Sequence, residues 1–241
     1  MDSDQNTTET TSMGGFFITG TDTDVGKTFV SGCIATNLIQ AGKNVAPRKP
    51  IASGCIRQTD GSLLAEDALF LQNACQSDDS LDKICPYQFE PAVSPHTAIK
   101  RANLSITLSD LALGCRTSDE HFTLVEGAGG FYSPIARDGL NKDLAVLLDH
   151  PVILVVANKL GCINQTLLSI EAIKSAGLRL HSIIINQVAA GTERDHSEGL
   201  TDFTDSPIFA VNYSENGQPF AITDWQINLV PTKVNGHLIS P

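Results

Sequence analysis

The chain has 241 residues, 41% of them hydrophobic, which is enough for one large core and too few for two full catalytic domains. Its formal net charge of −11 would repel a phosphate backbone, so we expect no nucleic-acid partner. The six cysteines are scattered, with no pair at two-residue spacing. This pattern argues against a zinc site or a disulfide framework and favours a reducing cytoplasm. No apolar run is long enough to span a bilayer, so we expect no membrane insertion.

Residues 1–13 are polar and acidic and lack the features of a signal peptide, so they are predicted to form a disordered N-terminal tail. Residues 14–241 are predicted to form a single α/β domain. Apolar runs typical of strands recur near 15–19, 44–49, 122–126, 151–157 and 181–186. Segments with helical spacing lie between them, as at 26–41, 63–76 and 164–176. This alternation predicts a doubly wound, mostly parallel sheet with helices on both faces, as in P-loop NTPases.

Individual runs also indicate their place in the sheet. The run 151–157 is apolar on both faces, which predicts a central strand, whereas Pro47 fits best in an edge strand. Residues 78–106 are proline-containing with little periodicity, and we interpret them as an ordered excursion from the main pattern. The pattern weakens in the last third of the chain, where two short strand-like runs remain at 208–211 and 227–230.

Residues 21–28 (TDTDVGKT) follow an apolar run and open an amphipathic helix, which is the context of a phosphate-binding loop. Backbone N–H groups at the helix N-terminus would wrap the phosphates of a nucleoside triphosphate. Lys27 would reach the terminal phosphates, and the Thr28 hydroxyl would ligate magnesium. The general pattern has a glycine where this chain has Thr21. The residues expected to hold the nucleotide here are Asp24, Val25, Gly26, Lys27 and Thr28.

Polar residues that end predicted strands have special weight, because ligands of open α/β sheets bind beyond the carboxyl ends of the strands. Lys49 is one such residue, and it is either a second cation near the loop or a solvated surface lysine. Glu126 is another, and its carboxylate would bind the magnesium. Small residues follow it, including Gly129, and they either let the backbone approach a phosphate or simply form a tight turn. Asp67 is either a second metal ligand or an ordinary acid near a helix N-terminus.

Two asparagines bear on the base of the nucleotide. Asn158 begins a segment similar to the guanine-reading element of GTPases, but that element needs an aspartate where this chain has Gly161. Guanine is therefore disfavoured. Asn186 ends another predicted strand and offers a donor and an acceptor, so it is either an adenine contact or a turn asparagine.

Four blocks occur in one order: GTDTDVGKT at 20–28, KPIASG at 49–54, VEGAGG at 125–130 and KLGCIN at 159–164. With these blocks the chain resembles the dethiobiotin synthetase family over roughly residues 14–188. The threonine in place of the first loop glycine is part of that family's pattern. The C-terminal region departs from it, because relatives usually carry a Gly-x-Ile/Leu-Pro element where this chain has residues 207–213.

The resemblance implies an ATP- and magnesium-dependent cyclo-ligase of biotin synthesis. Such an enzyme joins diaminopelargonic acid and carbon dioxide into dethiobiotin through a carbamate and a carbamic–phosphoric anhydride, with release of ADP and phosphate. Lys27 and Lys49 would supply positive charge to the phosphoryl transfer, which depends mainly on positioning and electrostatics. The resemblance further implies that Thr23 and Ser53 donate hydrogen bonds to the carbamate and the substrate.

The resemblance also implies ligand sets and a partner. Thr28, Asp67 and Glu126 would be the magnesium ligands, and Asn186 the adenine contact. In this family the substrate lies at a homodimer interface, where the partner subunit holds the substrate carboxylate. The residues implied in that role are Leu160, Gly161, Cys162 and Asn164. Asn164 is moreover expected to be the N-cap of the helix that follows it.

Three other interpretations of the function are possible alternatives to a synthetase. A ParA-like nucleotide switch usually carries an extra lysine early in the loop, and residues 21–25 have none. An amidotransferase related to the cobyric acid synthases would require a glutaminase domain after the sheet. A pseudoenzyme is disfavoured by the intact Lys27, Thr28 and Lys49.

Overall fold

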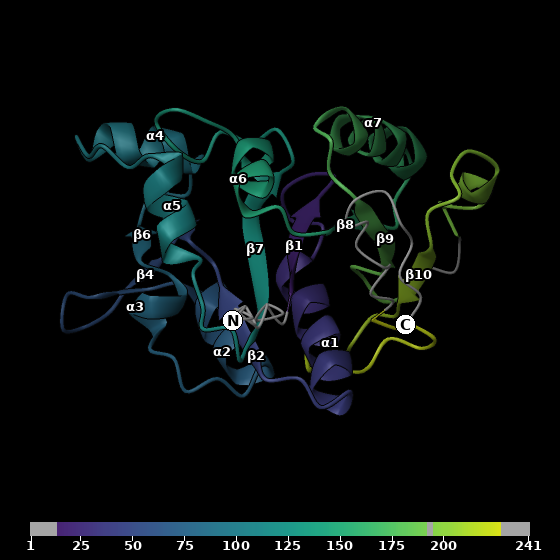
Figure 1. Cartoon of the computed structure of the whole chain (residues 1–241), viewed down its shortest axis with the longest axis horizontal. Helices are drawn as coiled ribbons and strands as arrows, with labels where there is room; N and C mark the ends of the chain where they lie inside the picture. Colours follow the sequence, from purple (N-terminus) through teal and green to yellow (C-terminus); the bar gives the residue numbers. More distant parts are fainter. Residues whose placement is uncertain (1–13, 192–194, 228–241) are drawn as a thin grey trace, which may run out of the picture.

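The computed structural model describes residues 14–191 and 195–227, so the tail predicted over 1–13 and most of the run at 227–230 lie outside the described residues. Its centre is a six-stranded parallel sheet in the order β10-β9-β8-β1-β7-β2 (Figure 1). The strands are β1 Gly15–Gly20, β2 Val45–Arg48, β7 Phe122–Gly130, β8 Val152–Ala157, β9 Leu180–Asn186 and β10 Ile208–Val211. The parallel sheet, its five predicted strands and the run at 208–211 are thereby confirmed.

Helices connect these strands. They are α1 Lys27–Gln40, α2 Glu66–Ala74, α3 Leu81–Ile84, α4 Pro95–Arg101, α5 Leu108–Gly114, α6 Asn141–Leu148 and α7 Cys162–Ser175, with a 3₁₀ turn at Leu200–Asp202. The helices predicted at 26–41 and 164–176 are confirmed. The prediction at 63–76 was wrong at its start, because Leu63–Leu64 (β5) pairs antiparallel with Ile56–Arg57 (β4) before α2 begins. Within the described ranges, none of the helices combines the length and apolarity needed to cross a membrane.

Each face of the sheet is covered by different elements, because successive side chains of a strand point to opposite faces. Phe16 and Ile18 of β1 belong to a core with the buried residues of α1. Phe17 belongs to a second core with residues of α4, α5, α6 and α7. Helices therefore cover both faces, as predicted.

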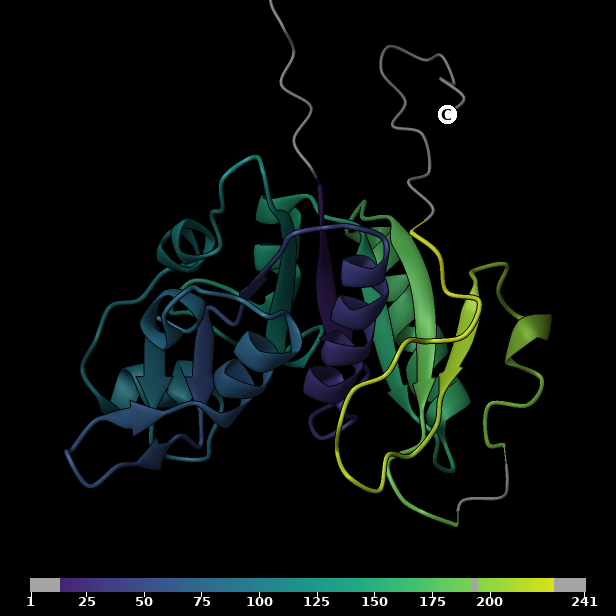
Figure 2. The same cartoon turned by 90° about the horizontal axis from the view of Figure 1, so that it is seen from below.

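The edges of the sheet also agree with the sequence pattern. β8, which is buried throughout, lies in the interior of the sheet, and β2 with Pro47 lies at one edge. Beside β2, the strands β3 Ile51–Ser53 and β6 Tyr87–Phe89 form a small parallel pair, and Figure 2 shows them next to the main sheet. Because α3, β6 and α4 fall within 78–106, the ordered excursion is confirmed.

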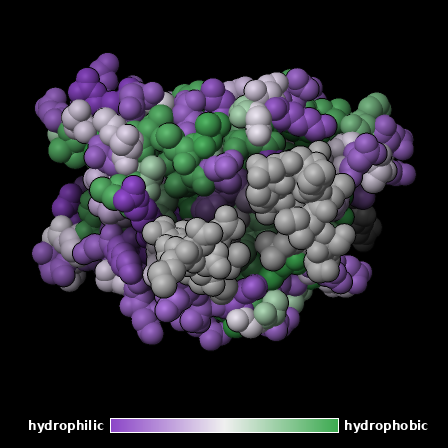
Figure 3. Space-filling view, in the orientation of Figure 1, coloured by the Kyte–Doolittle hydropathy of each residue, from purple (hydrophilic) through white to green (hydrophobic). Residues whose placement is uncertain are grey.

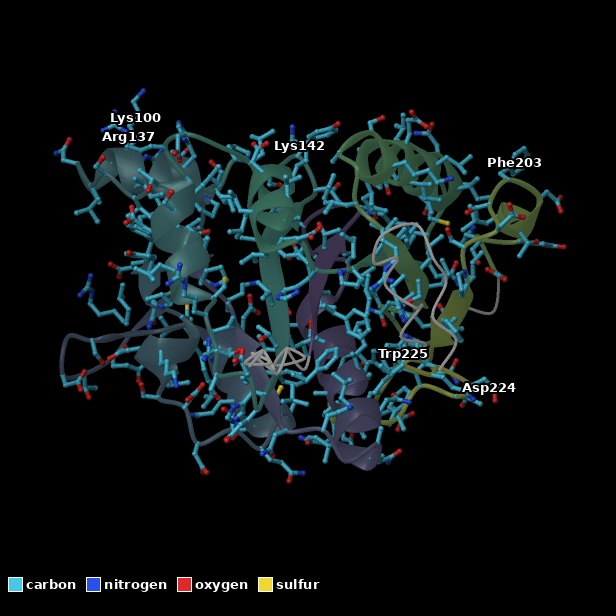
Figure 4. The ribbon with its side chains drawn as sticks, viewed as in Figure 1. Lys100, Arg137, Lys142, Phe203, Asp224 and Trp225 are labelled. Carbon is cyan, nitrogen blue, oxygen red and sulfur yellow. The ribbon has the colours of Figure 1, made fainter. Side chains whose placement is uncertain are left out.

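After β10 the chain crosses the outside of α1, and we call residues 212–227 the C-terminal strap (Figure 2). The strap contains no helix or strand, but Ile222 and Trp225 are buried in the core shared with α1. Figure 4 places Trp225 between the lower part of α1 and β10. The strap thus completes the apolar layer on the α1 face.

Candidate functional site

The loop between β1 and α1 turns sharply just before the helix. Asp24 and Gly26 both have left-handed backbone conformations, with φ of 57° and 83°. A Cβ at Gly26 would collide with the Asn186 amide nitrogen, so conformation and space both require glycine there. Gly26 is the N-cap of α1, with no side-chain cap and no acid in the first turn. The first N–H groups of the helix are therefore open to an anion.

Four side chains from different elements meet beside this loop: Thr28 of α1, Lys49 after β2, Asp67 of α2 and Glu126 of β7. Lys49 Nζ lies 2.7 Å from Glu126 Oε1 and 2.8 Å from Asp67 Oδ2. Thr28 Oγ1 lies 2.8 Å from Glu126 Oε1 and 2.9 Å from Asp67 Oδ1, so its proton can be donated to either carboxylate. Lys49 is only 4% exposed, and the alternative of a solvated surface lysine was therefore wrong.

Electrostatics couples the members of this cluster. Burial alone would favour neutral Lys49, but the charges and hydrogen bonds of Glu126 and Asp67 outweigh it and raise its pKa. Burial likewise opposes ionisation of Asp67, and the Lys49 charge overcomes this and lowers the pKa of the carboxyl group. Burial lowers the pKa of Lys27, and the nearby Lys49 charge lowers it further. An anion that bound between the two lysines would relieve their repulsion.

The end of β7 is held by a buried amide. Asn141 is fully buried, and its Nδ2 donates to Ala128 O at 2.6 Å and to Gly130 O at 2.9 Å. Its Oδ1 accepts from Ala128 N at 3.3 Å. Gly129 lies between them with φ of 76°, a conformation that favours glycine. Asn141 therefore fixes the small-residue loop that follows Glu126.

An open cleft of about 700 Å³ lies over the cluster. Most of the predicted site residues line it, namely Thr23, Asp24, Gly26, Lys27, Thr28, Lys49, Ser53, Asp67, Glu126 and Gly129. Val25 does not, because its side chain is fully buried under the loop. Asn186 lies below the loop, where its Nδ2 donates to Val25 O at 3.0 Å. Asn186 Oδ1 is buried and accepts no hydrogen bond from the described residues.

The segment predicted to serve a partner subunit lies away from this cleft. Leu160 is 88% exposed, while Cys162 is buried and its thiol donates to His196 O at 3.1 Å. The side chain of Cys162 thus faces its own subunit, and its N–H and carbonyl bind Lys159 O and Thr166 Oγ1 of the same chain. The expectation that Asn164 caps the next helix was wrong, because α7 already begins at Cys162 with Gly161 as its N-cap.

Several residues of the site were not predicted from the sequence. Phe29, Phe70 and Gly217 line the cleft, and nothing in the local sequence around Gly217 marks it as a neighbour of the loop. Ser31 binds the Glu126 carboxylate from below, with Oγ 2.8 Å from Oε2. A signal for Ser31 did exist, since it follows Thr28 by three residues and so shares its helix face.

The sequence of this chain matches a family model and is similar to those of named proteins. The family model described as an AAA domain matches residues 14–212. The ATP-dependent dethiobiotin synthetase BioD of Ruthia magnifica subsp. Calyptogena magnifica is 40% identical over 200 residues, which cover 83% of this chain and 92% of the relative. The protein with the same name from Aeromonas salmonicida (strain A449) is 41% identical over 188 residues, covering 77% of this chain and 82% of the relative.

Solved structures share the fold at lower identity. A ParA family ATPase from Chlorobium tepidum TLS has a TM-score of 0.52 and 17% identity, over 85% of this chain and 89% of that one. The MinC:MinD cell division protein complex of Aquifex aeolicus gives a TM-score of 0.52 and 18% identity, over 86% of this chain and 87% of the matched chain. At this identity the likeness shows the P-loop NTPase class of fold and nothing about activity.

Proposed function

We propose, because the chain belongs to the ATP-dependent dethiobiotin synthetase family, that it closes the ureido ring of dethiobiotin from diaminopelargonic acid and carbon dioxide with hydrolysis of ATP. The observation that carries the proposal is that Asp67 and Glu126 contact both Thr28 and a buried lysine beside an uncapped helix N-terminus. Two cations and open backbone donors suit a triphosphate, and the adjoining cleft gives room for a second substrate.

The donor set also fits magnesium. Magnesium prefers hard oxygen ligands and usually takes one or two carboxylates together with phosphate oxygens and water. Thr28, Asp67 and Glu126 would hold it, with two carboxylates and one hydroxyl facing one point of the cleft. No larger group of His, Cys, Asp and Glu suited to a metal occurs in the described part of the chain. When bound, magnesium would offset the negative charge of the phosphate oxygens.

The remaining residues have distinct proposed roles in the reaction. One substrate amine first combines with carbon dioxide as a carbamate, and Thr23 and Ser53 would orient it because both line the cleft. The carbamate oxygen then attacks the terminal phosphorus of ATP, and ADP leaves. Lys27 and Lys49 would stabilise the negative charge that spreads over the transferred group. Attack of the second amine on the resulting carbamic–phosphoric anhydride closes the ring and releases phosphate.

We further propose that Asn186 contacts adenine. Its buried Oδ1 has no donor among the described residues, and a buried acceptor of this kind is costly unless a ligand supplies the hydrogen bond. The exocyclic amine of adenine is such a donor. The amide nitrogen is already committed to Val25 O, so the oxygen is the atom left to face the base.

We propose that the working form is a cytoplasmic homodimer. The segment of Leu160, Gly161, Cys162 and Asn164 does not line the cleft of its own chain, so it would serve the substrate of a second copy. Exposed apolar side chains on the neighbouring helices suit such an interface, among them Leu147 of α6 and Leu168 of α7, which are 56% and 64% exposed. Figure 3 shows apolar residues gathered over the region of α6. The test is sedimentation of Leu168→Glu, which we expect to be monomeric where the unchanged protein is dimeric.

The test of the activity is phosphate release from magnesium–ATP with and without diaminopelargonic acid and bicarbonate, with the product mass checked. We expect release to require both substrates and to fall at least about a hundredfold in Lys49→Ala. Lys83→Ala is the matched control, because Lys83 also pairs with a carboxylate but is 58% exposed and lies outside the cleft. Hydrolysis that ignored the diamine would instead support a nucleotide switch.

A further inference from the structure

The two oxygens of the Glu126 carboxylate have different environments. Oε1 faces the cleft, where it meets Thr28 Oγ1 and Lys49 Nζ. Oε2 points the other way and accepts a hydrogen bond from Ser31 Oγ at 2.8 Å. Both Glu126 and Ser31 are buried, at 1% and 0% exposure. Ser31 thus holds the inner oxygen and leaves the outer one for the cleft.

The bond of Ser31 differs from those of other helix hydroxyls of this protein in how far along the sequence its partner lies. Hydroxyl groups within helices commonly bond back to the carbonyl four residues earlier. Thr36 of α1, Thr166 and Ser169 of α7 all do so, at 3.0, 2.7 and 2.8 Å. Ser31 instead donates to a carboxylate 95 residues away. Its hydroxyl therefore connects α1 to the end of β7.

We propose that Ser31 is a positioning residue that fixes the orientation of Glu126 as a metal ligand. This inference rests on the proposed function, in which Glu126 binds magnesium. Thr28 and Lys49 contact the same oxygen that would face the metal, so neither can hold the carboxylate once the metal takes that place. Ser31 contacts the opposite oxygen and keeps its bond in both states. Partners that orient a metal ligand in this way typically contribute about ten- to a hundredfold to metal affinity.

The test uses Mn²⁺ as the probe, with electron paramagnetic resonance titration of the full-length protein in the presence of ADP. We expect Ser31→Ala to weaken Mn²⁺ binding about tenfold or more. Thr36→Val removes a hydroxyl of the same helix that does not reach Glu126, and its Mn²⁺ affinity should equal that of the unchanged protein. Ser31→Thr keeps a hydroxyl, so it should recover most of the affinity even if the extra methyl group lowers the unfolding midpoint.

Three further measurements separate a positioning role of Ser31 from an effect on stability and from the proposed function. Thermal unfolding in EDTA gives the structural cost of each variant, and all titrations are made well below its midpoint. At saturating metal, Ser31→Ala should regain most of its kcat, whereas its metal requirement stays raised. If Glu126→Gln weakens Mn²⁺ binding and Ser31→Ala does not, the positioning role is overturned and the proposed function stands. If Glu126→Gln also binds Mn²⁺ normally, Glu126 is no ligand, and both its proposed magnesium role and the positioning role of Ser31 fail, while phosphate release still tests the proposed activity.

Discussion

The two halves of helix α1 contact very different regions of the molecule. Its first turns carry Thr28 and Ser31, which bind the carboxylates of the cleft. Its later turns carry Asn37, which binds the C-terminal strap through main-chain atoms of Ile222 and Trp225. Both regions are joined to the helix by side-chain hydrogen bonds to distant parts of the sequence. The contacts in the cleft form a network of charged groups, whereas the contacts with the strap are neutral.

This difference determines how each region responds to change. A charged side chain in the cleft is stabilised by the opposite charges around it. A bound ligand can replace one of these partners, but a substitution that removes a partner leaves a buried charge uncompensated. The strap is held by neutral hydrogen bonds and by the burial of Ile222 and Trp225. A substitution that removes one of these contacts loses only the stability that the contact itself contributes. We therefore expect large, coupled effects in the cleft and smaller, additive effects at the strap.

The largest effect should follow Lys49→Met. This change removes the cation that contacts both Asp67 and Glu126. We expect a loss of about 3 kcal/mol in the free energy of unfolding, at the low end for a buried pair because Asp67 is 45% exposed and the Lys27 charge remains nearby. Urea denaturation at pH 7 measures it. The coupling is tested by Lys49→Met combined with Glu126→Gln, which should regain much of the stability but none of the activity. A double variant no more stable than Lys49→Met would show that the cleft is not coupled by charge.

A smaller effect is expected from Asn37→Ala. The change removes the donor to Ile222 O at 3.0 Å and the acceptor for Ile222 N at 2.7 Å. Because each such bond contributes about 1 kcal/mol and alanine gains about 0.6 kcal/mol in helix propensity, the net loss should be about 1–2 kcal/mol. Urea denaturation gives the loss, and limited proteolysis should cut within the strap faster.

Asn37→Asp is the matched variant, since it keeps the acceptor and loses the donors. It should fall between the unchanged protein and Asn37→Ala in stability. An Asn37→Ala protein with unchanged stability and proteolysis would mean that apolar packing alone holds the strap. The contrast between the two halves of α1 would then lie in burial rather than in polar bonding.

The cleft could be predicted to a greater extent than the strap. The loop at 21–28 and the strands carry local patterns, and the carboxyl ends of parallel strands necessarily meet at one edge, so Lys49 and Glu126 could be placed near Thr28 from sequence. The start of α2 was predicted wrongly, because Leu63–Leu64 belongs to a short hairpin in which it pairs with Ile56–Arg57. A local signal for this hairpin did exist, since Asp60 and Gly61 lie between the two strands and are typical turn residues.

The long-range contacts of α1 could not be predicted from local sequence. The partner of Ser31 lies 95 residues away and that of Asn37 lies 185 residues away, so no local pattern links either pair. Gly217 approaches the cleft for the same reason, through a strap whose path is set by the burial of Trp225. The roles of the individual cleft residues in catalysis remain predictions, which the variants above would test.

The last effect, similar in size to that of Asn37→Ala but present only in acid, concerns a histidine against the strap. His181 packs against Phe16 and Trp225, with ring centroids 4.6 and 5.7 Å away, and its Nε2 is buried without a partner in the described residues. Burial, with a smaller contribution from the Arg179 charge, lowers its pKa to about 4. The unfolded chain, with a pKa near 6.5, therefore binds more protons than the native state between these values.

Stability should accordingly fall as the pH drops from about 6.5 towards 4, and the loss should be complete below the native pKa. The full shift corresponds to about 3 kcal/mol, but partial exposure of the ring reduces our expectation to about 1–2 kcal/mol. His181→Gln has no titrating ring, so the difference between its stability and that of the unchanged protein isolates this contribution from the carboxylates and from His150. Urea denaturation at pH 7 and pH 4.5 should show that difference shrinking or reversing in acid. Parallel losses in both proteins would mean that His181 does not make the packing of the strap sensitive to pH.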